Sequence, residues 1–242
     1  MTEFSPDPPV SQTSDAMRKR EKDLADREAE LAKRERDVRL QEERTKPNFP
    51  REFLCIKPVV HHDIEVEIPP ARIGLMRNML GAYYMQCGVL VYNVICAIAV
   101  VSTPNIEDKK NATGGWATHM GVSIVHLLGI PGAFMLWYWS TYTAVKKGTS
   151  GQYLQSLVGI AVAFFYNLFM MLGISGYGAS GWLIALQIRD EKQGSVGFIM
   201  TMLCAVFFTG LIFFFAWAFK RVNRCKNEDK ATSLAGVLAS AI

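Results

Sequence analysis

The chain has 242 residues, a formal net charge of +4 and hydrophobic residues at half of its positions. Most of the charge lies before Asn78, and beyond that residue charges occur only in short clusters between long apolar runs. Because a helix that crosses a bilayer needs about 20 apolar residues, this pattern excludes an ordinary soluble domain and predicts an all-α membrane protein. We expect no nucleic-acid partner.

The N-terminal third is predicted to be a polar tail followed by a charged helix. Residues 1–15 contain three prolines, so we expect a disordered tail and no cleavable signal peptide. Residues 16–46 repeat every seven positions (REKDLAD, REAELAK, RERDVRL) and pair acids with bases four residues apart, as in Glu30 with Arg34. A stable coiled coil needs two apolar positions in each heptad, and here the second of these positions is charged. This coiled-coil-like helix should therefore be a solvated cytosolic arm and not a strong dimer. Its single apolar line is Met17, Leu24, Leu31 and Val38.

Residues 47–78 are predicted to be extended, because of their prolines, and to end in a short amphipathic helix on the membrane surface. That interfacial helix would carry Arg72, Ile73, Leu75, Met76 and Arg77. The segment also contains residue types that bind metals. Their spacing matches no established site, so we expect neither a metal nor a cofactor. These residues are Cys55, His61, His62 and Asp63.

Four apolar runs follow, at residues 79–101, 116–137, 153–175 and 196–219. Each is predicted to be a transmembrane helix, because backbone polar groups inside lipid must be satisfied within their own segment. Together they predict a four-helix transmembrane bundle at residues 79–222, followed by a cytosolic tail at 223–242. Glycines at positions 81, 88, 121, 129 and 159 are expected to let these helices approach one another closely.

The positions of the basic residues predict the orientation of the bundle. Lysines and arginines lie before the first span, between the second and third, and after the fourth, whereas the other two loops are balanced in charge. We therefore expect both termini and the loop at residues 140–152 in the cytosol. Cys225 follows the fourth span among basic residues and is a candidate for palmitoylation, with a free cytosolic thiol as the favoured alternative. Asn111 begins a glycosylation sequon in a predicted lumenal loop, and because it lies so close to the second span we expect it to be used poorly.

The spans contain polar residues but no Asp, Glu, Lys or Arg. These residues could form a proton or ligand path, or they could hydrogen-bond between helices, and we favour packing because transport sites usually carry ionisable groups. No P-loop, dinucleotide fingerprint or nucleophile motif occurs, so we expect no enzymatic activity and no catalytic residue. The predicted helix-packing polar residues are Gln86, Asn93, His119, His126 and Asn167.

The stretch GIPGAFMLWYWSTYTAVKKG, residues 129–148, leaves the second span through an aromatic cluster and ends on two lysines. Pro131 cannot donate the usual helix hydrogen bond, so we expect a bend there. Aromatic rings favour the headgroup level and anionic lipids attract lysines, so we expect this stretch to contact the membrane surface. The predicted membrane-contact residues are Trp137, Tyr138, Trp139, Tyr142, Lys146 and Lys147.

The order of these features resembles the secretory carrier membrane proteins, or SCAMPs. The matching stretches are REAELAKRERDV, KPNFP, HHDIEVEIP and GIPGAFMLWYWSTYTAVKK, and the HHDI and EIP pieces look most like plant and protist members. The resemblance implies a charged N-terminal helix, four spans, two cytosolic termini, and contact with anionic lipids or phosphoinositides after the second span. In that last stretch Trp137, Tyr138, Tyr142 and Ala144 match the family, whereas Trp139, Ser140 and Thr143 depart from it.

On this basis we expect a non-catalytic integral membrane protein of secretory and endocytic transport vesicles, acting in post-Golgi and endosomal recycling traffic. The resemblance implies the trans-Golgi network, endosomes, recycling vesicles and the plasma membrane as its locations. It also implies trafficking proteins recruited by the N-terminal helix, and homo- or hetero-oligomers in the membrane. Two alternatives stay open: a small channel or transporter subunit, and a tetraspan protein that shapes membrane curvature. Flux assays in proteoliposomes would separate the first from a trafficking role.

Overall fold

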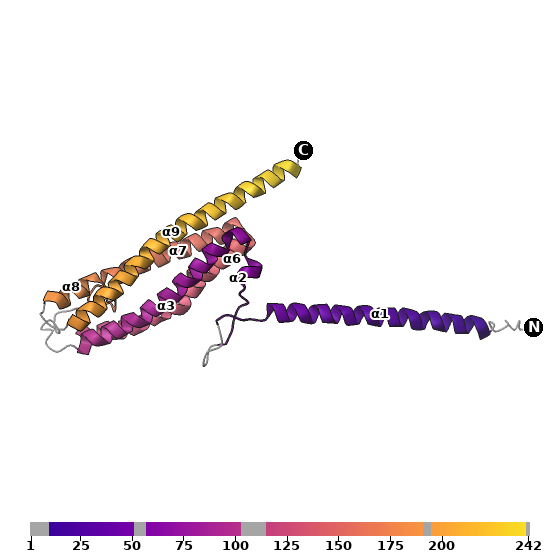
Figure 1. The fold of residues 1–242 in the computed structure, drawn as a ribbon, viewed down its shortest axis with the longest axis horizontal. Helices are drawn as coiled ribbons and strands as arrows, with labels where there is room; N and C mark the ends of the chain where they lie inside the picture. Colours follow the sequence, from indigo (N-terminus) through magenta and orange to yellow (C-terminus); the bar gives the residue numbers. More distant parts are fainter. Residues whose placement is uncertain (1–9, 51–56, 103–114, 191–194, 241–242) are drawn as a thin grey trace, which may run out of the picture. The chain divides into compact units, whose positions relative to one another are not determined.

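A computed structural model describes residues 10–50, 57–102, 115–190 and 195–240, which fall into two units divided between Asp63 and Ile64. The first unit contains a long helix, α1 (Val10–Thr45), drawn in indigo in Figure 1. This helix begins before the predicted start at Ala16. Its apolar line is exposed, between 52% at Val38 and 64% at Met17. The charged helix is therefore long and solvated along its described length.

A short paired segment follows α1 within the first unit. Phe49 and Val60 form an antiparallel bridge, in which the Val60 amide donates to the Phe49 carbonyl over 3.1 Å. The side chain of Asn48 brackets the backbone of His62 with two hydrogen bonds, of 2.7 and 3.0 Å. His61 Nδ1 lies 2.9 Å from the Lys46 carbonyl oxygen. Both histidines thus contribute to this local structure, and Cys55 lies outside the described residues.

The second unit opens with a helical turn, α2 (Ile64–Glu67), and a 3₁₀ turn, η1 (Pro70–Arg72), that leads directly into α3 (Ile73–Ser102). Pro70 suits the first turn of a helix, where its missing N–H leaves no bond unmade. The predicted interfacial helix is therefore not a separate element but the first turns of the first span. Met76, which was expected at the membrane surface, is fully buried.

Four helical segments are long and apolar enough to cross a membrane, which confirms the predicted all-α four-span fold. The first is α3 and the third is α7 (Ser150–Leu172). The fourth is the apolar part of α9 (Ser195–Ser240). This apolar part ends near Phe219, and the helix continues beyond it through the predicted tail. Helix α9 runs alongside both α3 and α7 (Figure 1).

The second span is a chain of short helical pieces: α4 (Gly115–Val125), η3 (His126–Leu128), α5 (Gly129–Ala133), η4 (Phe134–Trp139) and α6 (Ser140–Lys147). The irregularity centres on Pro131, as expected for a residue that cannot donate to the preceding turn. The segment before it tightens to a 3₁₀ helix, and η4 after it widens to a π-helix. Side-chain hydroxyl groups satisfy backbone carbonyls in this widened turn. Ser140 donates to the Leu136 carbonyl and Thr141 to the Trp137 carbonyl, over 2.6 Å each.

A glycine-rich loop and one more helix connect the third and fourth spans. The loop, residues 173–181, contains three glycines with positive φ, at positions 173, 176 and 178. Helix α8 (Trp182–Asp190) follows and buries Ile184 and Ile188 against Val100 of α3. The sequence reading placed no helix here, because residues 148–188 form one uncharged stretch.

One glycine contact fixes the spacing of the second and third spans. A Cβ atom on Gly159 of α7 would lie 1.9 Å from the Leu136 carbonyl oxygen, so the two backbones touch at a point that only glycine allows. Next to it, Thr141 and Ser156 share a buried hydrogen bond of 2.7 Å. By contrast, Cβ atoms on glycines 81, 88 and 121 would meet open space, so the predicted close approach is wrong at these three positions.

Candidate functional site

A set of charged and hydroxyl side chains gathers at one end of the bundle, and we call it the polar clasp. Its members come from the segment before the first span, the end of the second span, the start of the third and the extension of the fourth. They are Glu67, Arg72, Tyr142, Lys146, Tyr153 and Asp229.

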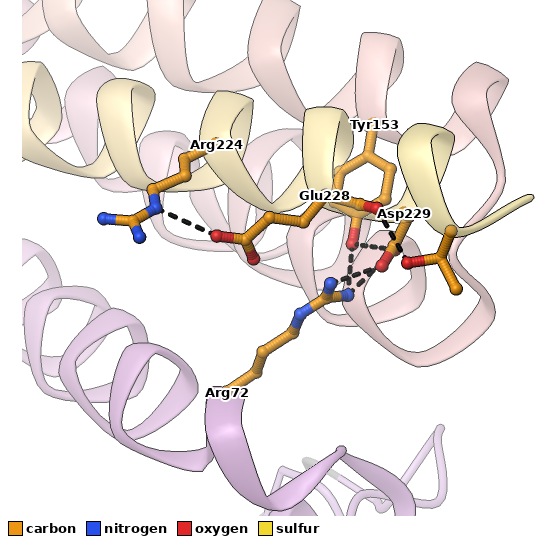
Figure 2. A network of polar contacts seen from close by, with 6 residues as sticks. Arg72, Tyr153, Arg224, Glu228 and Asp229 are labelled. Carbon is orange, nitrogen blue, oxygen red and sulfur yellow. Dashed lines mark hydrogen bonds and ion pairs between the residues drawn. The ribbon is translucent and has the colours of Figure 1, made fainter. Parts of the chain in front are cut away.

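Arg72 is the centre of the first half of the polar clasp (Figure 2). Its Nη1 donates to the Tyr153 hydroxyl over 2.7 Å and to Asp229 Oδ2 over 2.8 Å, and its Nη2 donates to Asp229 Oδ1. The Tyr153 hydroxyl in turn donates to Asp229 Oδ2 over 2.8 Å. Three elements, η1, α7 and α9, are therefore joined by a closed ring of charge-assisted hydrogen bonds.

The ion pair at this centre is shielded from water. The side chains of Arg72 and Asp229 are only 13% and 26% exposed. The hydrogen bonds from Arg72 lower the pKa of the Asp229 carboxyl, which lies beyond the apolar part of α9. Asp229 is therefore ionised at every pH near neutrality, and the ring is held together by opposite charges.

Glu67 is the centre of the second half of the polar clasp. Its Oε1 lies 2.8 Å from the Lys146 ammonium, and its Oε2 accepts a hydrogen bond from the Tyr142 hydroxyl. The segment before the first span is thereby tied to α6, the exit of the second span. A more exposed pair, Arg77 with Glu65, adds a further link on the same segment over 2.6 Å.

The predicted membrane-contact residues divide into a buried and an exposed group. Trp137, Tyr138 and Tyr142 are at most 2% exposed, so their rings pack inside the bundle and not toward lipid. The Tyr83 ring stacks on Tyr138 at 5.4 Å between centroids, and the Phe215 ring meets Trp137 edge-on at 5.0 Å. The members that keep exposed surface are Trp139, Lys146 and Lys147.

The predicted helix-packing polar residues are all buried or half-buried, and three of them hold the loop at 173–181. Asn93 donates to the Gly178 carbonyl over 2.7 Å and accepts from the Ser180 amide over 2.8 Å. His119 Nδ1 accepts from the Gly178 amide over 3.2 Å. His126 Nε2 lies 2.9 Å from the Tyr177 carbonyl oxygen, which assigns the donating proton to that nitrogen.

Gln86 and Asn167 are the other two polar residues, and they are placed differently. Both line a cavity among the first three spans, away from the loop at 173–181. The structure therefore separates the five residues into a loop-holding group and a cavity-lining group, which sequence spacing did not distinguish.

Cys225 lies beside the polar clasp, on the inner face of α9. Its side chain is 7% exposed, and burial raises the pKa of its thiol. Palmitoylation there stays a prediction, and it would require the thiol to leave this packed position. The sequon at Asn111 lies outside the described residues.

Sequence reasoning missed four members of the polar clasp: Glu67, Arg72, Tyr153 and Asp229. One signal was available for two of them, because Glu67 and Arg72 stand within three residues of Pro69 and Pro70, just before the first span, where an unpaired charge would be costly to bury. The choice of partner depends on how the helices pack, and the spacing of residues along the chain does not encode it.

Comparison with known proteins places this bundle among named relatives. A protein-family model described as the SCAMP family matches residues 46–229. Secretory carrier-associated membrane protein 5 of Homo sapiens is 23% identical over 180 residues, which cover 73% of this chain and 72% of the relative. Secretory carrier-associated membrane protein 4 of Homo sapiens is 24% identical over 185 residues, 76% of this chain and 75% of the relative. No solved structure matches significantly. The family match begins after α1, so the charged arm lies outside it.

Proposed function

Because the chain belongs to the SCAMP family, we propose that it is a non-catalytic membrane protein of secretory and endocytic transport vesicles. In this proposal it acts in post-Golgi and endosomal recycling traffic, recruiting cytosolic partners and contacting the cytosolic leaflet. The names of its relatives, which call them secretory carrier-associated membrane proteins, support the vesicle setting.

The polar clasp is the observation that carries the proposal. Its ion pairs and hydrogen bonds join four segments of the chain at one end of the bundle, and its charged groups bind one another. Arg72 and Asp229 also border an open pocket with Arg221, Arg224 and Glu228, but their hydrogen-bonding groups are directed at each other. The arrangement suits a rigid platform that holds the exit of the second span and the extension of the fourth at one end of the bundle.

The basic residues support a cytosolic position for this platform. Lys146 and Lys147 end α6 at the clasp, and Lys220, Arg221 and Arg224 follow the apolar part of α9 at the same end. Positive residues next to spans favour the cytosolic side. In the proposed topology the polar clasp and both termini face the cytosol, and the loop at 173–181 lies toward the opposite side.

The leaflet contact is proposed for the exposed members of the α6 end only. Lys147 and Trp139 present charge and ring surface outward, whereas Lys146 is shared with Glu67. A lysine near an anionic surface contributes about 1 kcal/mol, so this contact is weak by itself and depends on ionic strength. Anionic lipids, phosphoinositides among them, are the proposed ligands.

Partner recruitment is proposed for α1. It is a 36-residue helix whose described side chains are solvated, and its exposed apolar line of Met17, Leu24, Leu31 and Val38 is too narrow for a strong coiled coil with itself. A partner that supplies a wider apolar seam would complete it. Oligomers within the membrane remain part of the proposal.

The channel or transporter alternative is less well supported by the geometry. The candidates for its polar pathway were Gln86, Asn93, His119 and His126. Of these, Asn93, His119 and His126 hydrogen-bond to the loop at 173–181, and Gln86 lines the cavity among the first three spans. These contacts support a packing role for the three loop-bonded residues, of the kind that polar residues inside a bundle usually have.

Localisation and proximity labelling test the proposal together. A full-length copy that carries a labelling enzyme at its N-terminus should co-fractionate with post-Golgi and endosomal carriers and should label cytosolic trafficking proteins. A copy lacking residues 1–45 should keep that membrane location and lose most of those neighbours. Residence in an unrelated membrane, or solute flux through purified protein in proteoliposomes, would contradict the proposal.

A further inference from the structure

Two buried amide side chains in the bundle lack the partners that buried polar groups normally have. Gln86 of α3 is 2% exposed, and neither its Nε2 nor its Oε1 has a hydrogen-bond partner among the described residues. Asn167 of α7 is 1% exposed; its Nδ2 donates to the Ala163 carbonyl over 2.8 Å, but its Oδ1 has no partner in the described part of the chain. One donor group and two acceptors are therefore left over.

Both side chains line the same cavity, which has a volume of about 120 Å³. This is the space of about four water molecules at liquid density, enough for a hydroxyl group and several carbon atoms. The wall of this cavity is largely apolar, and the three unmatched polar atoms border it. Unmatched buried polar groups are normally met by ordered water, so either water or the polar group of a ligand is expected to reach them. Trp137 and Tyr166 also line it, and the small residues in its wall are Gly129, Gly132, Ala133, Gly159 and Ala163.

The cavity opens toward lipid. Its outer rim is formed by Leu136 of the second span and Val162 of the third, whose side chains are 53% and 48% exposed. Both residues lie well inside apolar spans, so the solvent at the rim is hydrocarbon. The ligand is therefore expected to arrive from the bilayer.

The residues that line the cavity indicate which chemical groups the ligand carries. No charged side chain lines the cavity among the residues that the structure describes, so a phosphate, carboxylate or ammonium group would be uncompensated at this depth. A hydroxyl group both donates and accepts, so it can accept from Gln86 Nε2 and donate to Gln86 Oε1 or Asn167 Oδ1. An apolar body suits the glycine and alanine wall and the lipid-facing mouth.

We propose that this cavity between α3, the α5–η4 segment and α7 binds the hydroxyl end of a neutral lipid. Sterols and diacylglycerols share this chemistry, an uncharged hydroxyl on an apolar body. Gln86 is the main hydrogen-bonding group, Asn167 supplies a second acceptor, and the body of the lipid leaves the cavity past Leu136 and Val162.

Photolabelling of the full-length protein tests the proposal. The protein is placed in phosphatidylcholine nanodiscs with a photoreactive sterol or a photoreactive diacylglycerol, each with its hydroxyl free. At least one probe should label peptides that contain residues 129–137 or 159–167. An excess of the unlabelled lipid should compete, whereas the same lipid with its hydroxyl methylated should not. The probe that labels and is competed identifies the source of the hydroxyl.

Two variants and one control sharpen the test. Gln86→Leu removes the main hydrogen-bonding group and should reduce labelling about fivefold, the ratio that corresponds to one lost hydrogen bond. Gly132→Leu fills the cavity, because a Cβ there meets open space, and should abolish the labelling. Gly210→Leu places the same side chain at an exposed glycine of α9, where a Cβ also meets open space, and should leave labelling unchanged.

A second readout separates binding from folding. In lipid-free detergent, Gln86→Leu should unfold at the same temperature as the natural protein or above it, because it removes an amide that has no partner. Added hydroxyl lipid should stabilise the natural protein and not the variant. The proposal is overturned if neither probe labels the cavity, if the methylated lipid competes equally, or if Gln86→Leu keeps both labelling and lipid-dependent stabilisation; water alone would then occupy the site.

Discussion

The guanidinium of Arg72 and the carboxylate of Asp229, 157 positions apart in sequence, form a two-point ion pair that also includes the Tyr153 hydroxyl. Arg72 precedes the first span, and Asp229 lies on the helix that extends the fourth. The pair therefore fastens the two ends of the four-span domain to each other and to the start of the third span (Figure 2). It anchors the part of α9 that continues beyond the apolar run.

Removing this pair should destabilise the bundle measurably. Hydrogen bonds to charged groups contribute about 1.5–3 kcal/mol, so we expect Arg72→Ala to lower the free energy of unfolding by about that amount. The matched control is Arg224→Ala on α9. Arg224 pairs with Glu228, and their side chains are 69% and 52% exposed, so this substitution should lower the free energy of unfolding by less than about 1 kcal/mol. Both are measured by unfolding in mixed micelles with increasing sodium dodecyl sulfate. Equal effects of the two variants would show that the clasp has no special role.

The same pair predicts a pH dependence. Because Arg72 lowers the pKa of Asp229, the ionised carboxylate stabilises the fold above the ordinary carboxyl pKa of about 4, and this contribution is lost as the pH falls through the lowered value. The stability difference between the natural protein and Asp229→Asn should therefore be constant from about pH 7 to pH 5 and shrink only in stronger acid. A difference that disappeared at about pH 6 would contradict the assignment.

The two lysines at the end of α6 should not be equivalent in the folded protein. Lys146 is paired with Glu67, so Lys147→Ala should reduce the preference for phosphatidylserine by up to about fivefold, and Lys146→Ala should reduce it less. Glu67→Gln should raise that preference by freeing Lys146. Spin-labelled phosphatidylserine in reconstituted vesicles reports this selectivity by electron paramagnetic resonance. An isolated peptide of the segment, in which Glu67 is absent, is the control and should respond equally to both lysine changes.

The loop at 173–181 should tolerate no side chain at Gly178. Its φ of +73° disfavours any L-residue by about 1–2 kcal/mol, and a Cβ would lie 2.4 Å from the Ser123 amide nitrogen. We expect Gly178→Ala to destabilise the bundle by at least about 2 kcal/mol. Gly210→Ala in α9 should have the opposite sign, a gain of about 0.5–1 kcal/mol, because alanine suits a helix interior better than glycine. A neutral Gly178→Ala would show that the loop is not fixed by its packing.

The spans were predictable because each is a long uncharged run, and a bilayer leaves such a run little choice but a helix. The irregular second span was predictable in part: Pro131 marked the place, but the π-helix that buries Trp137 and Tyr138 depends on Ser140 and Thr141 satisfying the widened turn. Aromatic rings near a membrane exit suit either the lipid headgroup level or a protein core. Which of the two they occupy depends on residues of other helices that pack against them.

Helix α8 and the polar clasp were not predictable for the same reason. The glycines at 173–181 signalled a break, yet the uncharged residues after them fit either a span or a packed surface helix. The charges of Glu67, Arg72 and Asp229 were visible, but the sequence does not show which of them meet. Asn93 and His119 were expected to hydrogen-bond between helices, and their partners here are backbone groups of the loop at 173–181.

The central claim is that the end of the bundle bearing the polar clasp faces the cytosol, and labelling of sealed vesicles with a membrane-impermeant thiol reagent tests it most directly. The variants are Thr149→Cys, in the exposed turn between α6 and α7, and Val196→Cys, 69% exposed at the other end of the bundle at the start of α9, with the natural protein as background. In vesicles isolated with their cytosolic face outward, Thr149→Cys should react at once and Val196→Cys only after detergent is added. Protection of Thr149→Cys together with immediate reaction of Val196→Cys would invert the topology and contradict the proposed role of the clasp as a cytosolic platform.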